Sequence, residues 1–377
     1  MCRIIYSEKY NLYNLGPEHP FSPLRVEMVI DLIRSLGLNF EFTEPSAVSP
    51  EELEAVHDKE YIQAVEDLSA GKEVAGFSKY GFGTQDNPIV KGMAEGARYH
   101  AGGTLLGAKT LLNGDAKKVI QFGGGLHHAQ SSMASGFCIY NDLAVAIKEM
   151  TNAGWHVAYL DLDVHHGDGV QKMFYSDGEV MTISLHESGE FLYPGSGWVY
   201  ELGQGMGRSL KINVPLEPFT EGDSYLEAVK KVVAPALSWF RPDALVIQSG
   251  ADPHFSDPLA DLLLTAQDFE KIYREVITLA DKHCKGRALF TFGGGYSLTA
   301  TPRIWALLYL ILKDIPVPEK LPAEWKEKWE KKLNKKFPET FYDPLPAYDE
   351  IPRKPEIVRT NKDTYQRIMD SVAADWL

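Results

Sequence analysis

Residues 158–169 read Ala-Tyr-Leu-Asp-Leu-Asp-Val-His-His-Gly-Asp-Gly, and the fold is best inferred from this stretch outward. It opens with apolar, β-prone residues and changes abruptly to acids, histidines and glycines. That change predicts a buried strand, then a glycine-rich loop, then a helix. Asp163 and His165 are two positions apart, so in an extended chain both point to the same side. A carboxylate and an imidazole converging there suit a divalent metal of the zinc type.

Three other predicted strands also end in glycines followed by His, Asp or Tyr. An Asp or His after a single strand is often only a helix cap, but repetition at four strand ends indicates one constructed site, because ligands bind at the carboxyl edge of parallel sheets. Asp252 then supplies a third metal ligand and leaves a position open for substrate. The three further stretches are Gly-Gly-Gly-Leu-His-His (123–128), Ser-Gly-Ala-Asp (249–252) and Gly-Gly-Gly-Tyr (293–296).

The alternation of predicted strands and helices beyond residue 92 is typical of an α/β fold, a parallel sheet covered on both faces. Helices are also expected after the N-capping residues Ser22 and Ser49, and residues 71–91 are expected to form a long surface loop. Strands are predicted at 3–6, 117–122, 155–161, 179–185, 209–214, 243–248 and 287–292, and helices at 93–113, 141–153, 168–176, 222–239, 266–284 and 297–313.

Residues 317–377 change character, because Trp, Lys, Glu and Pro dominate and no strand pattern remains. We therefore expect a main α/β domain over residues 1–316. The C-terminal extension, residues 317–377, is expected either to pack on that domain or to mediate contacts, including those of a homo-oligomer. Within it, residues 325–336 are as consistent with a solvated helix face as with a partner site.

Composition narrows the functional classes. The chain has 377 residues and a net charge of -14, from 38 basic and 52 acidic residues, which argues against nucleic-acid binding. A local acidic rim could instead attract a cationic substrate. Three cysteines lack metal-type spacing. No signal pattern opens the chain, and the apolar run from Ile304 to Leu312 is too short for a bilayer, so we expect a cytoplasmic protein without a membrane partner.

With these motifs in view, the chain resembles the histone deacetylase superfamily, and more closely its prokaryotic acetoin-utilisation branch. The resemblance spans roughly residues 3–315 and rests on several motifs in matching order and spacing. These are Gly-Gly-Leu-His-His-Ala (124–129), Gly-Phe-Cys-Ile-Tyr-Asn-Asp (136–142), Asp-Leu-Asp-Val-His-His-Gly-Asp-Gly-Val-Gln (161–171), Ser-Leu-His-Glu-Ser-Gly (184–189), Tyr-Pro-Gly-Ser-Gly (193–197), Gln-Ser-Gly-Ala-Asp-Pro (248–253) and Gly-Gly-Gly-Tyr (293–296).

The resemblance implies an arginase-like three-layer α/β/α fold with a mainly parallel, eight-stranded sheet, and a zinc-dependent amidohydrolase. Asp163, His165 and Asp252 would bind Zn²⁺, although the same ligands accept Fe²⁺. A structural K⁺ is implied near these residues, close to Asp161 and the Ser184–Leu185 pair.

The same resemblance assigns acid–base and carbonyl-polarising roles. His128, paired with Asp168, would be the general base. His127, paired with Asp161, would be its electrostatic or acid partner. Tyr296 would polarise the acyl carbonyl.

Substrate contacts are also implied. Gly136, Phe137, Tyr193 and Gly294 would border a narrow tunnel for an acyl-lysine side chain, and Asp86 would bind the substrate backbone at the rim. Tyr193 stands where Phe is usual in the family, which leaves acyl-chain preference open, and Pro253 replaces a more usual Thr or Ser.

Several interpretations of the function and of individual residues remain open from the sequence alone. The favoured function is deacylation of lysine on proteins or peptides; the alternatives are deacetylation of small amides such as acetylpolyamines, and non-catalytic binding of acyl-lysine. A two-metal ureohydrolase would need further ligands. His57, His166 and His186 are expected to be structural, Cys138 is expected to be a small buried residue, and Arg25 either faces the foot of the pocket or is exposed.

Overall fold

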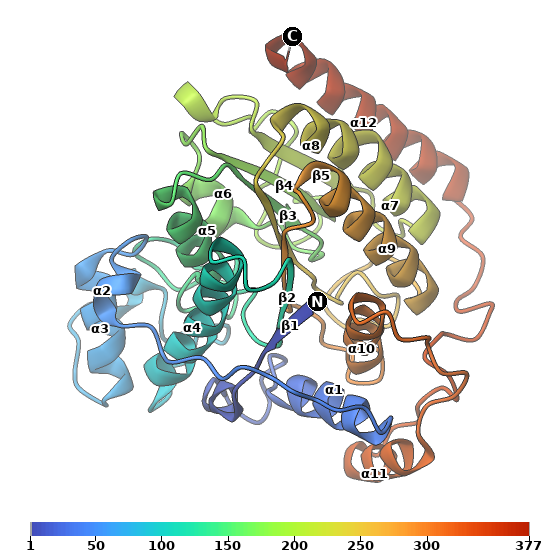
Figure 1. Ribbon diagram of the computed structural model, residues 1–377, viewed down its shortest axis with the longest axis horizontal. Coiled ribbons are helices and arrows are strands. Elements are labelled where there is room, and N and C mark those ends of the chain that lie inside the picture. The colour runs from blue at the N-terminus through green and yellow to red at the C-terminus, as the bar shows by residue number, and fades with distance from the viewer. Residues whose placement is uncertain (1, 377) are drawn as a thin grey trace.

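A seven-stranded parallel sheet forms the middle layer of the molecule, whose computed structural model describes residues 2–376 (Figure 1). The strand order is β1-β2-β7-β6-β3-β4-β5, and every neighbouring pair is parallel. All seven predicted strands are confirmed. They are β1 (Cys2–Ile5), β2 (Lys118–Gln121), β3 (Val157–Asp161), β4 (Val180–Glu187), β5 (Lys211–Leu216), β6 (Ala244–Gln248) and β7 (Ala288–Thr291).

The eight-stranded sheet implied by the resemblance is wrong for residues 2–376. Beside the edge strand β1, the chain pairs only through one isolated bridge between Ile5 and Thr43. Thr43 exchanges backbone hydrogen bonds with Ile4 and Tyr6 at 2.8 and 3.2 Å. Pro45 follows two residues later and has no N–H to donate, so the ladder does not extend.

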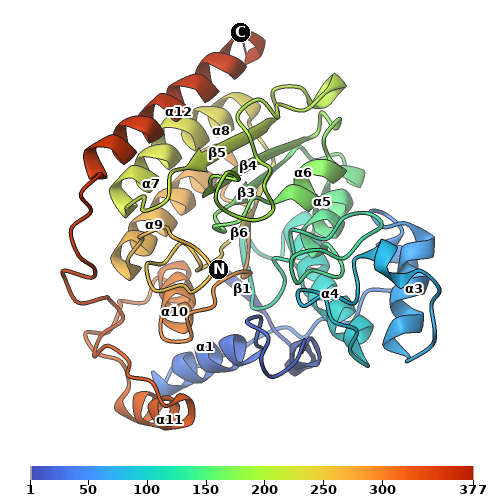
Figure 2. The ribbon, with the colours of Figure 1, turned by 180° about the vertical axis from the view of Figure 1, so that it is seen from behind.

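Helices cover both faces of the sheet, as expected from the alternating pattern (Figures 1 and 2). Alternate residues of β3 pack into different layers: Val157 and Tyr159 into one, Ala158 and Leu160 into the other. The first layer contains α4 (Met93–Leu112), α5 (Asp142–Asn152) and α6 (Asp168–Met173), and the second contains α1 (Leu24–Ser35), α7 (Gly222–Ala228), α8 (Ala234–Phe240), α9 (Ala266–His283) and α10 (Thr301–Leu312).

The shorter elements differ from the sequence predictions in detail. Ser49 does form a capping box with Glu52, but the helix it begins, α2 (Pro50–Leu53), lasts one turn before α3 (Lys59–Ser69) starts. Ser22 accepts a hydrogen bond from the backbone of Leu24, one residue before the helical cap. The remaining elements are the 3₁₀ turns η1 (Glu8–Leu12), η2 (Phe77–Tyr80, within the predicted loop) and η3 (Gly205–Gly207), and the π turn η4 (Val229–Val233) that joins α7 to α8.

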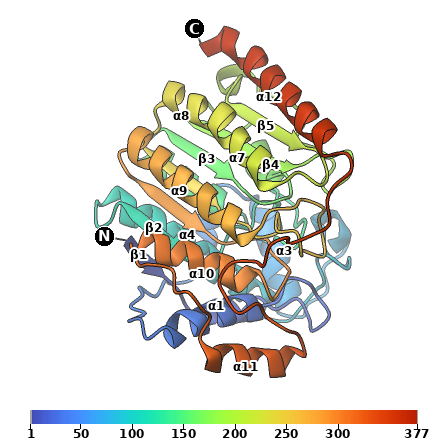
Figure 3. The same ribbon diagram turned by 90° about the vertical axis from the view of Figure 1, so that its right-hand side faces the viewer.

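The C-terminal extension contains two helices, α11 (Ala323–Leu333) and α12 (Lys354–Trp376), and both pack on the rest of the chain (Figure 3). Trp325 and Trp329 of α11 are buried and donate their indole N–H groups to the Met28 carbonyl and the Asp31 carboxylate of α1, at 3.0 and 2.7 Å. On α12, Asn361 accepts a hydrogen bond from the backbone of Glu217 at 3.0 Å. The extension therefore covers α1 at one end of the molecule and the β5 side at the other.

Asp343 anchors the segment between α11 and α12 inside the core. Its carboxylate binds Arg303 Nη2 at 2.8 Å, His254 Nε2 at 2.9 Å and the backbone N–H of Ala266 at 2.7 Å. Burial opposes a charge on Asp343, but the hydrogen bond to His254 and the charge of Arg303 outweigh it and hold its pKa below the ordinary value. This carboxylate therefore stabilises the fold above the ordinary Asp pKa of about 4, and the contribution is lost as the pH falls through the lower, folded-state pKa.

We predict that Asp343→Asn lowers the free energy of unfolding at pH 7 by about 3–5 kcal/mol, because Arg303 is left buried without its counter-charge. The difference from wild type should shrink as the pH falls below about 4, because the carboxylate then takes up a proton in the unfolded chain before it does so in the folded protein. Denaturant unfolding at pH 7 and at lower pH measures both effects. Asp363→Asn, at an exposed position of α12, is the matched control. An equal loss at every pH would contradict the assigned role of the charge.

Candidate active site

Four neighbouring strands end at the same level of the sheet. Gln121 of β2, Thr291 of β7, Gln248 of β6 and Asp161 of β3 are register partners across the sheet. The loops that follow these residues therefore start side by side at one carboxyl edge, as expected for a ligand crevice.

Asp163, His165 and Asp252 converge at this edge. All three are buried, and their ligand atoms lie within 4.8 Å of one another. His165 Nδ1 lies 3.0 Å from Asp163 Oδ1 and 3.4 Å from Asp252 Oδ2. The other carboxylate oxygens are fixed by the protein: Val164 N–H donates to Asp252 Oδ1 at 2.9 Å, and Gly294 N–H donates to Asp163 Oδ2 at 2.9 Å.

The charges of this trio fit a cation. Burial and the charge of Asp163 raise the pKa of Asp252 to about 8, while burial of Asp163 is outweighed by His127 and His165, which keep its pKa well below the ordinary value. Asp252 Oδ2 is buried and accepts no hydrogen bond from any residue between 2 and 376. A divalent metal bound by Asp163, His165 and Asp252 would satisfy that oxygen and neutralise the paired carboxylates.

At Gly294 the backbone leaves space for the carboxylates of Asp163 and Asp252; the three residues Asp163, His165 and Asp252 are called the cradle. A Cβ atom there would lie 1.9 Å from Asp252 Oδ2 and 2.4 Å from Asp163 Oδ2, which no side chain can do. The glycine therefore lets the strand-end loop approach the carboxylates closely enough to donate its N–H.

Two histidine–aspartate pairs lie beside Asp163 and His165, and the pKa values of the two imidazoles are shifted in opposite directions. His127 Nδ1 lies 2.7 Å from Asp161 Oδ2, and burial of His127 is outweighed by Asp161 and Asp163, which raise its pKa to about 9. His128 Nδ1 lies 2.7 Å from Asp168 Oδ1, yet burial and the charge of His127 lower its pKa to about 4. The neighbouring carboxylates thus favour the charged form of His127, whereas burial favours the neutral form of His128, at a ring separation of 4.0 Å.

Aromatic side chains border the approach to the histidines. The Tyr193 ring lies 5.1 Å from the His128 ring, and its hydroxyl is 2.5 Å from Ser135 Oγ. A Cβ atom at Gly136, which has φ +47°, would lie 2.4 Å from His128 Cδ2, so a side chain there would displace the imidazole. Phe137 has φ 70°, a costly conformation for a non-glycine residue that is often found at ligand sites.

Tyr296 packs against one of these aromatic side chains, Phe137. Its ring lies 5.8 Å from the Phe137 ring, edge to face. Asp257 accepts its backbone N–H at 2.6 Å and fixes the glycine loop, a role that the sequence analysis did not anticipate. Arg25 is buried beneath the same loop and donates to the carbonyls of Gly293 and Gly295 at 2.7 and 3.0 Å. The exposed alternative for Arg25 is therefore wrong.

Asp86 is exposed, as expected for a residue of the predicted surface loop. It borders an open groove of about 600 Å³ together with His19, Phe137 and Leu259. His19 was missed from the sequence, although its Nε2 lies 3.2 Å from the Asp86 carbonyl and its ring lies 4.6 Å from the Phe137 ring. In the sequence, His19 lies in a Pro-rich stretch near the N-terminus. This local pattern does not indicate its contacts with Asp86 and Phe137.

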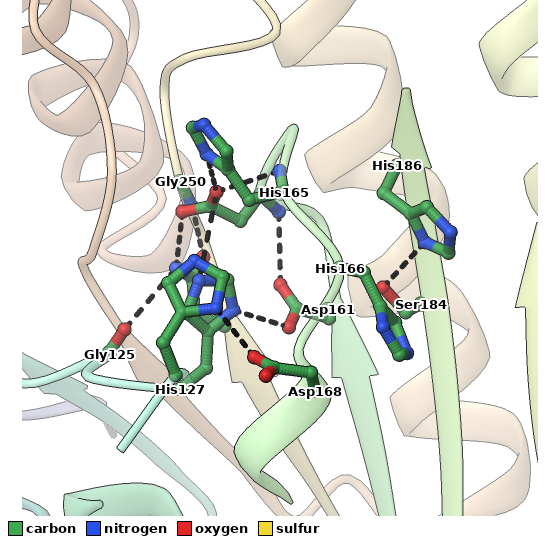
Figure 4. A network of polar contacts seen from close by, with 12 residues as sticks. Gly125, His127, Asp161, His165, His166, Asp168, Ser184, His186 and Gly250 are labelled. Atoms are coloured by element: carbon green, nitrogen blue, oxygen red, sulfur yellow. Dashed lines mark hydrogen bonds and ion pairs between the residues drawn. The ribbon is translucent and has the colours of Figure 1, made fainter. Parts of the chain in front are cut away.

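The other histidines of the motifs have structural partners, as expected. His166 bonds Ser196 and Gln171 at 2.9 and 3.2 Å, and it lies beside His186, apart from His127 and His165 (Figure 4). His57 accepts a hydrogen bond from the backbone of Asn141 at 2.9 Å. Cys138 is buried, and burial raises the pKa of its thiol well above the ordinary value, so it is not a reactive thiolate.

Gln248 was not predicted as part of the site. It is the last residue of β6, and its side-chain amide donates to Asp163 Oδ2 at 2.5 Å while its oxygen accepts Gly250 N–H at 2.6 Å. The available signal was an uncharged polar residue that closes an otherwise apolar strand, directly before the ligand loop.

Comparison with known proteins places this geometry in a family. The histone deacetylase domain matches residues 19–312. The chain belongs to the histone deacetylase family. It is 41% identical to the acetoin utilization protein AcuC of Bacillus subtilis (strain 168), over 98% of this chain and 97% of that protein, and 37% identical to AcuC of Staphylococcus aureus (strain MRSA252), over 95% and 94%.

Solved structures of the histone deacetylase family agree with the architecture. The crystal structure of a histone deacetylase homologue complexed with SAHA superposes with a TM-score of 0.87 at 28% identity, covering 97% of this chain and 99% of that one. A homologue from Aquifex aeolicus gives a TM-score of 0.84 at 28% identity, covering 96% and 99%. The chain is thus an amidohydrolase of the histone deacetylase family, whose fold implies dependence on a metal. Between residues 2 and 376, no helix has the length and apolar character needed to cross a membrane.

We predict that His165→Ala loses metal while the adjacent variant His166→Ala retains it. Removal of a ligand should weaken Zn²⁺ binding by more than about 100-fold, which exceeds the usual effect of a residue that only orients a ligand. The zinc content of each desalted protein, after equilibration with one equivalent, measures the difference. Full occupancy in His165→Ala, or equal loss in both variants, would contradict the ligand assignment.

Proposed function

We propose that this protein is a zinc-dependent lysine deacylase, which hydrolyses acetyl or longer acyl groups from lysine side chains of proteins or peptides. The observation that supports this most directly is that Asp163, His165 and Asp252 are buried beside two adjacent histidines, each paired with its own aspartate and with pKa values shifted in opposite directions. When bound, Zn²⁺ would supply Lewis acidity at the acyl carbonyl and lower the pKa of water.

His128 is proposed as the general base. Because Asp168 accepts its Nδ1–H, the Nε2 atom is left as the acceptor, and the low pKa keeps this imidazole neutral and ready to take a proton. After proton transfer, the same Nε2–H can protonate the departing lysine amine. Gln130 supports the pair, since its amide donates to Asp168 Oδ2 at 2.9 Å.

His127 and Tyr296 are proposed to stabilise developing charge. Asp161, which also accepts the Tyr159 hydroxyl at 2.6 Å, holds His127 through Nδ1 and favours its charged form. A cationic imidazole beside the neutral base favours the negative charge that develops during attack on the carbonyl. The Tyr296 hydroxyl would donate a hydrogen bond to the acyl oxygen from the opposite wall.

The shape of the approach favours an unbranched alkyl side chain. Gly136, Phe137 and Tyr193 would form the walls around the lysine methylenes, and Gly294 would keep the floor open at the carboxylates. Asp86, exposed at the rim, would accept hydrogen bonds from the substrate backbone, which favours a peptide over a small amide. Fe²⁺ could replace Zn²⁺ at these ligands. A structural K⁺ is proposed to bind separately, beside Asp161.

A substrate panel tests this function. Zinc-loaded protein would be offered acetyl-lysine peptides, longer acyl-lysine peptides and acetylated polyamines, with and without a hydroxamate chelator. We expect peptide hydrolysis that the chelator abolishes. A preference for acetylated polyamines would support the small-amide alternative instead, and binding of acyl-lysine peptides without turnover would indicate a binding module.

The variant Tyr296→Phe tests whether the Tyr296 hydroxyl contributes to catalysis. Loss of the hydroxyl should lower kcat by roughly 10²–10³, with unchanged zinc content and little change in KM. Tyr200→Phe, at a position 72% exposed, is the matched control. Turnover of Tyr296→Phe within about threefold of wild type would exclude the assigned role.

A further inference from the structure

A second groove, of about 930 Å³, opens on the same edge of the sheet as the active site. Its walls come from the loops that follow β4, β5 and β6, and from residues 348–360 at the start of α12. In Figure 3 the chain between α11 and α12 runs past the arrowheads of these strands. The C-terminal extension therefore forms one wall of the groove, and the strand-end loops form the other. We call it the acidic groove.

The floor of the acidic groove is apolar and open. Phe191 and Phe219 line it and expose 56% and 47% of their surface, and Leu263, Ile351 and Pro352 lie beside them. Large aromatic side chains left in contact with solvent and gathered in a concavity are typical of binding surfaces.

The rim of the acidic groove has excess negative charge. Five carboxylates line it, and Arg353 is the single cationic side chain among the lining residues. Arg353 is already paired with Glu356 at 2.8 Å. An apolar floor within a negative rim is complementary to a segment that combines basic and apolar side chains. The carboxylates belong to Glu217, Asp261, Asp349, Glu350 and Glu356.

The acidic groove adjoins the approach to the histidines. Phe191 precedes Tyr193 by two residues on the loop that borders His128. On another loop, Asp261 follows Leu259 by two residues, and Leu259 lines the groove at Asp86 and Phe137. Glu187 at the end of β4 accepts the Asp261 N–H at 2.8 Å and fixes this second loop. The loops that line the acidic groove thus also carry Tyr193, beside His128, and Leu259, beside Asp86 and Phe137.

We propose that the acidic groove binds the flank of the substrate polypeptide, specifically a stretch near the acyl-lysine that contains Lys or Arg and a large apolar residue. This inference rests on the proposed function, and it narrows the substrate class to acyl-lysines in a basic sequence context. The groove favours such a flank over a neutral or acidic one, because its carboxylates attract only the basic side chains.

Two measurements test the proposal separately from catalysis. Fluorescence anisotropy would follow a labelled peptide in which norleucine replaces the acyl-lysine and the flank contains three Arg and one Leu, against a peptide with Gln in place of Arg. The flank would be placed on either side of the norleucine. Kinetics would compare acetyl-lysine peptides with the same flanks and a short acetyl-lysine amide without any flank.

We expect the Arg peptide to bind at least fivefold more tightly than the Gln peptide. Asp349→Lys with Glu350→Lys should weaken binding of the Arg peptide roughly five- to tenfold and raise its KM similarly, while the short amide is turned over as by wild type. Phe191→Ala should also weaken binding of both peptides. The matched charge control replaces two exposed acids of α11, Glu324→Lys with Glu327→Lys. It should change neither the binding of the Arg peptide nor its KM.

Each outcome decides one claim. Equal binding of the Arg and Gln peptides, or an equal effect of the α11 control, overturns the proposal. Displacement of the Arg peptide by spermine at the concentration of peptide itself would assign the groove to a free polycation and also overturns it. Failure to hydrolyse any acyl-lysine contradicts the proposed function, whereas the anisotropy result still tests the groove.

Discussion

Two buried carboxylates that face a common point, Asp163 and Asp252, are the constraint on which the rest of the site depends. Burial makes such a pair costly unless hydrogen bonds and a cation compensate it. The protein supplies the hydrogen bonds from Gln248, Val164 and Gly294, and it leaves Asp252 Oδ2 without one. The level strand ends of β3 and β6 set the starting points of the loops that bear these carboxylates.

The same negative charge organises the neighbouring histidines. Asp161 and Asp163 together favour a charged His127, and that charge in turn adds to burial in keeping His128 neutral. Two adjacent and chemically identical side chains thereby take different states. The direction of each pKa shift follows from the carboxylates close to that ring. Asp161 and Asp163 together outweigh the burial of His127, whereas Asp168 alone does not outweigh the burial of His128.

Much of this arrangement could be predicted from the sequence. The seven strands are short, mostly apolar runs, and the proposed ligand residues follow two of them, β3 and β6, within a few positions, so local pattern sufficed. The family resemblance, in contrast, implied an eighth strand, and the single bridge at Thr43 shows why it does not form here. Helix α12 was missed because its apolar positions, such as Ile357, Tyr365 and Ile368, are sparse within a polar stretch.

What the sequence could not reveal depends on contacts between distant segments. Arg25 reaches the loop at Gly293 across 268 positions, and Asp343 meets His254 across 89. The acidic groove likewise joins three loops to a segment more than eighty residues later. No local pattern marks such pairings, because each residue is an ordinary surface type until the fold buries it.

Asp163, His165 and Asp252 are proposed to bind the metal, and the proposed chemistry depends on this site. The most direct test is a crystal structure of the zinc-equilibrated protein with anomalous data at the zinc absorption edge. We expect a strong anomalous peak between these three residues, within about 2.0–2.2 Å of a His165 nitrogen and of one oxygen from each aspartate. An empty cradle together with a peak elsewhere in the protein would contradict this assignment.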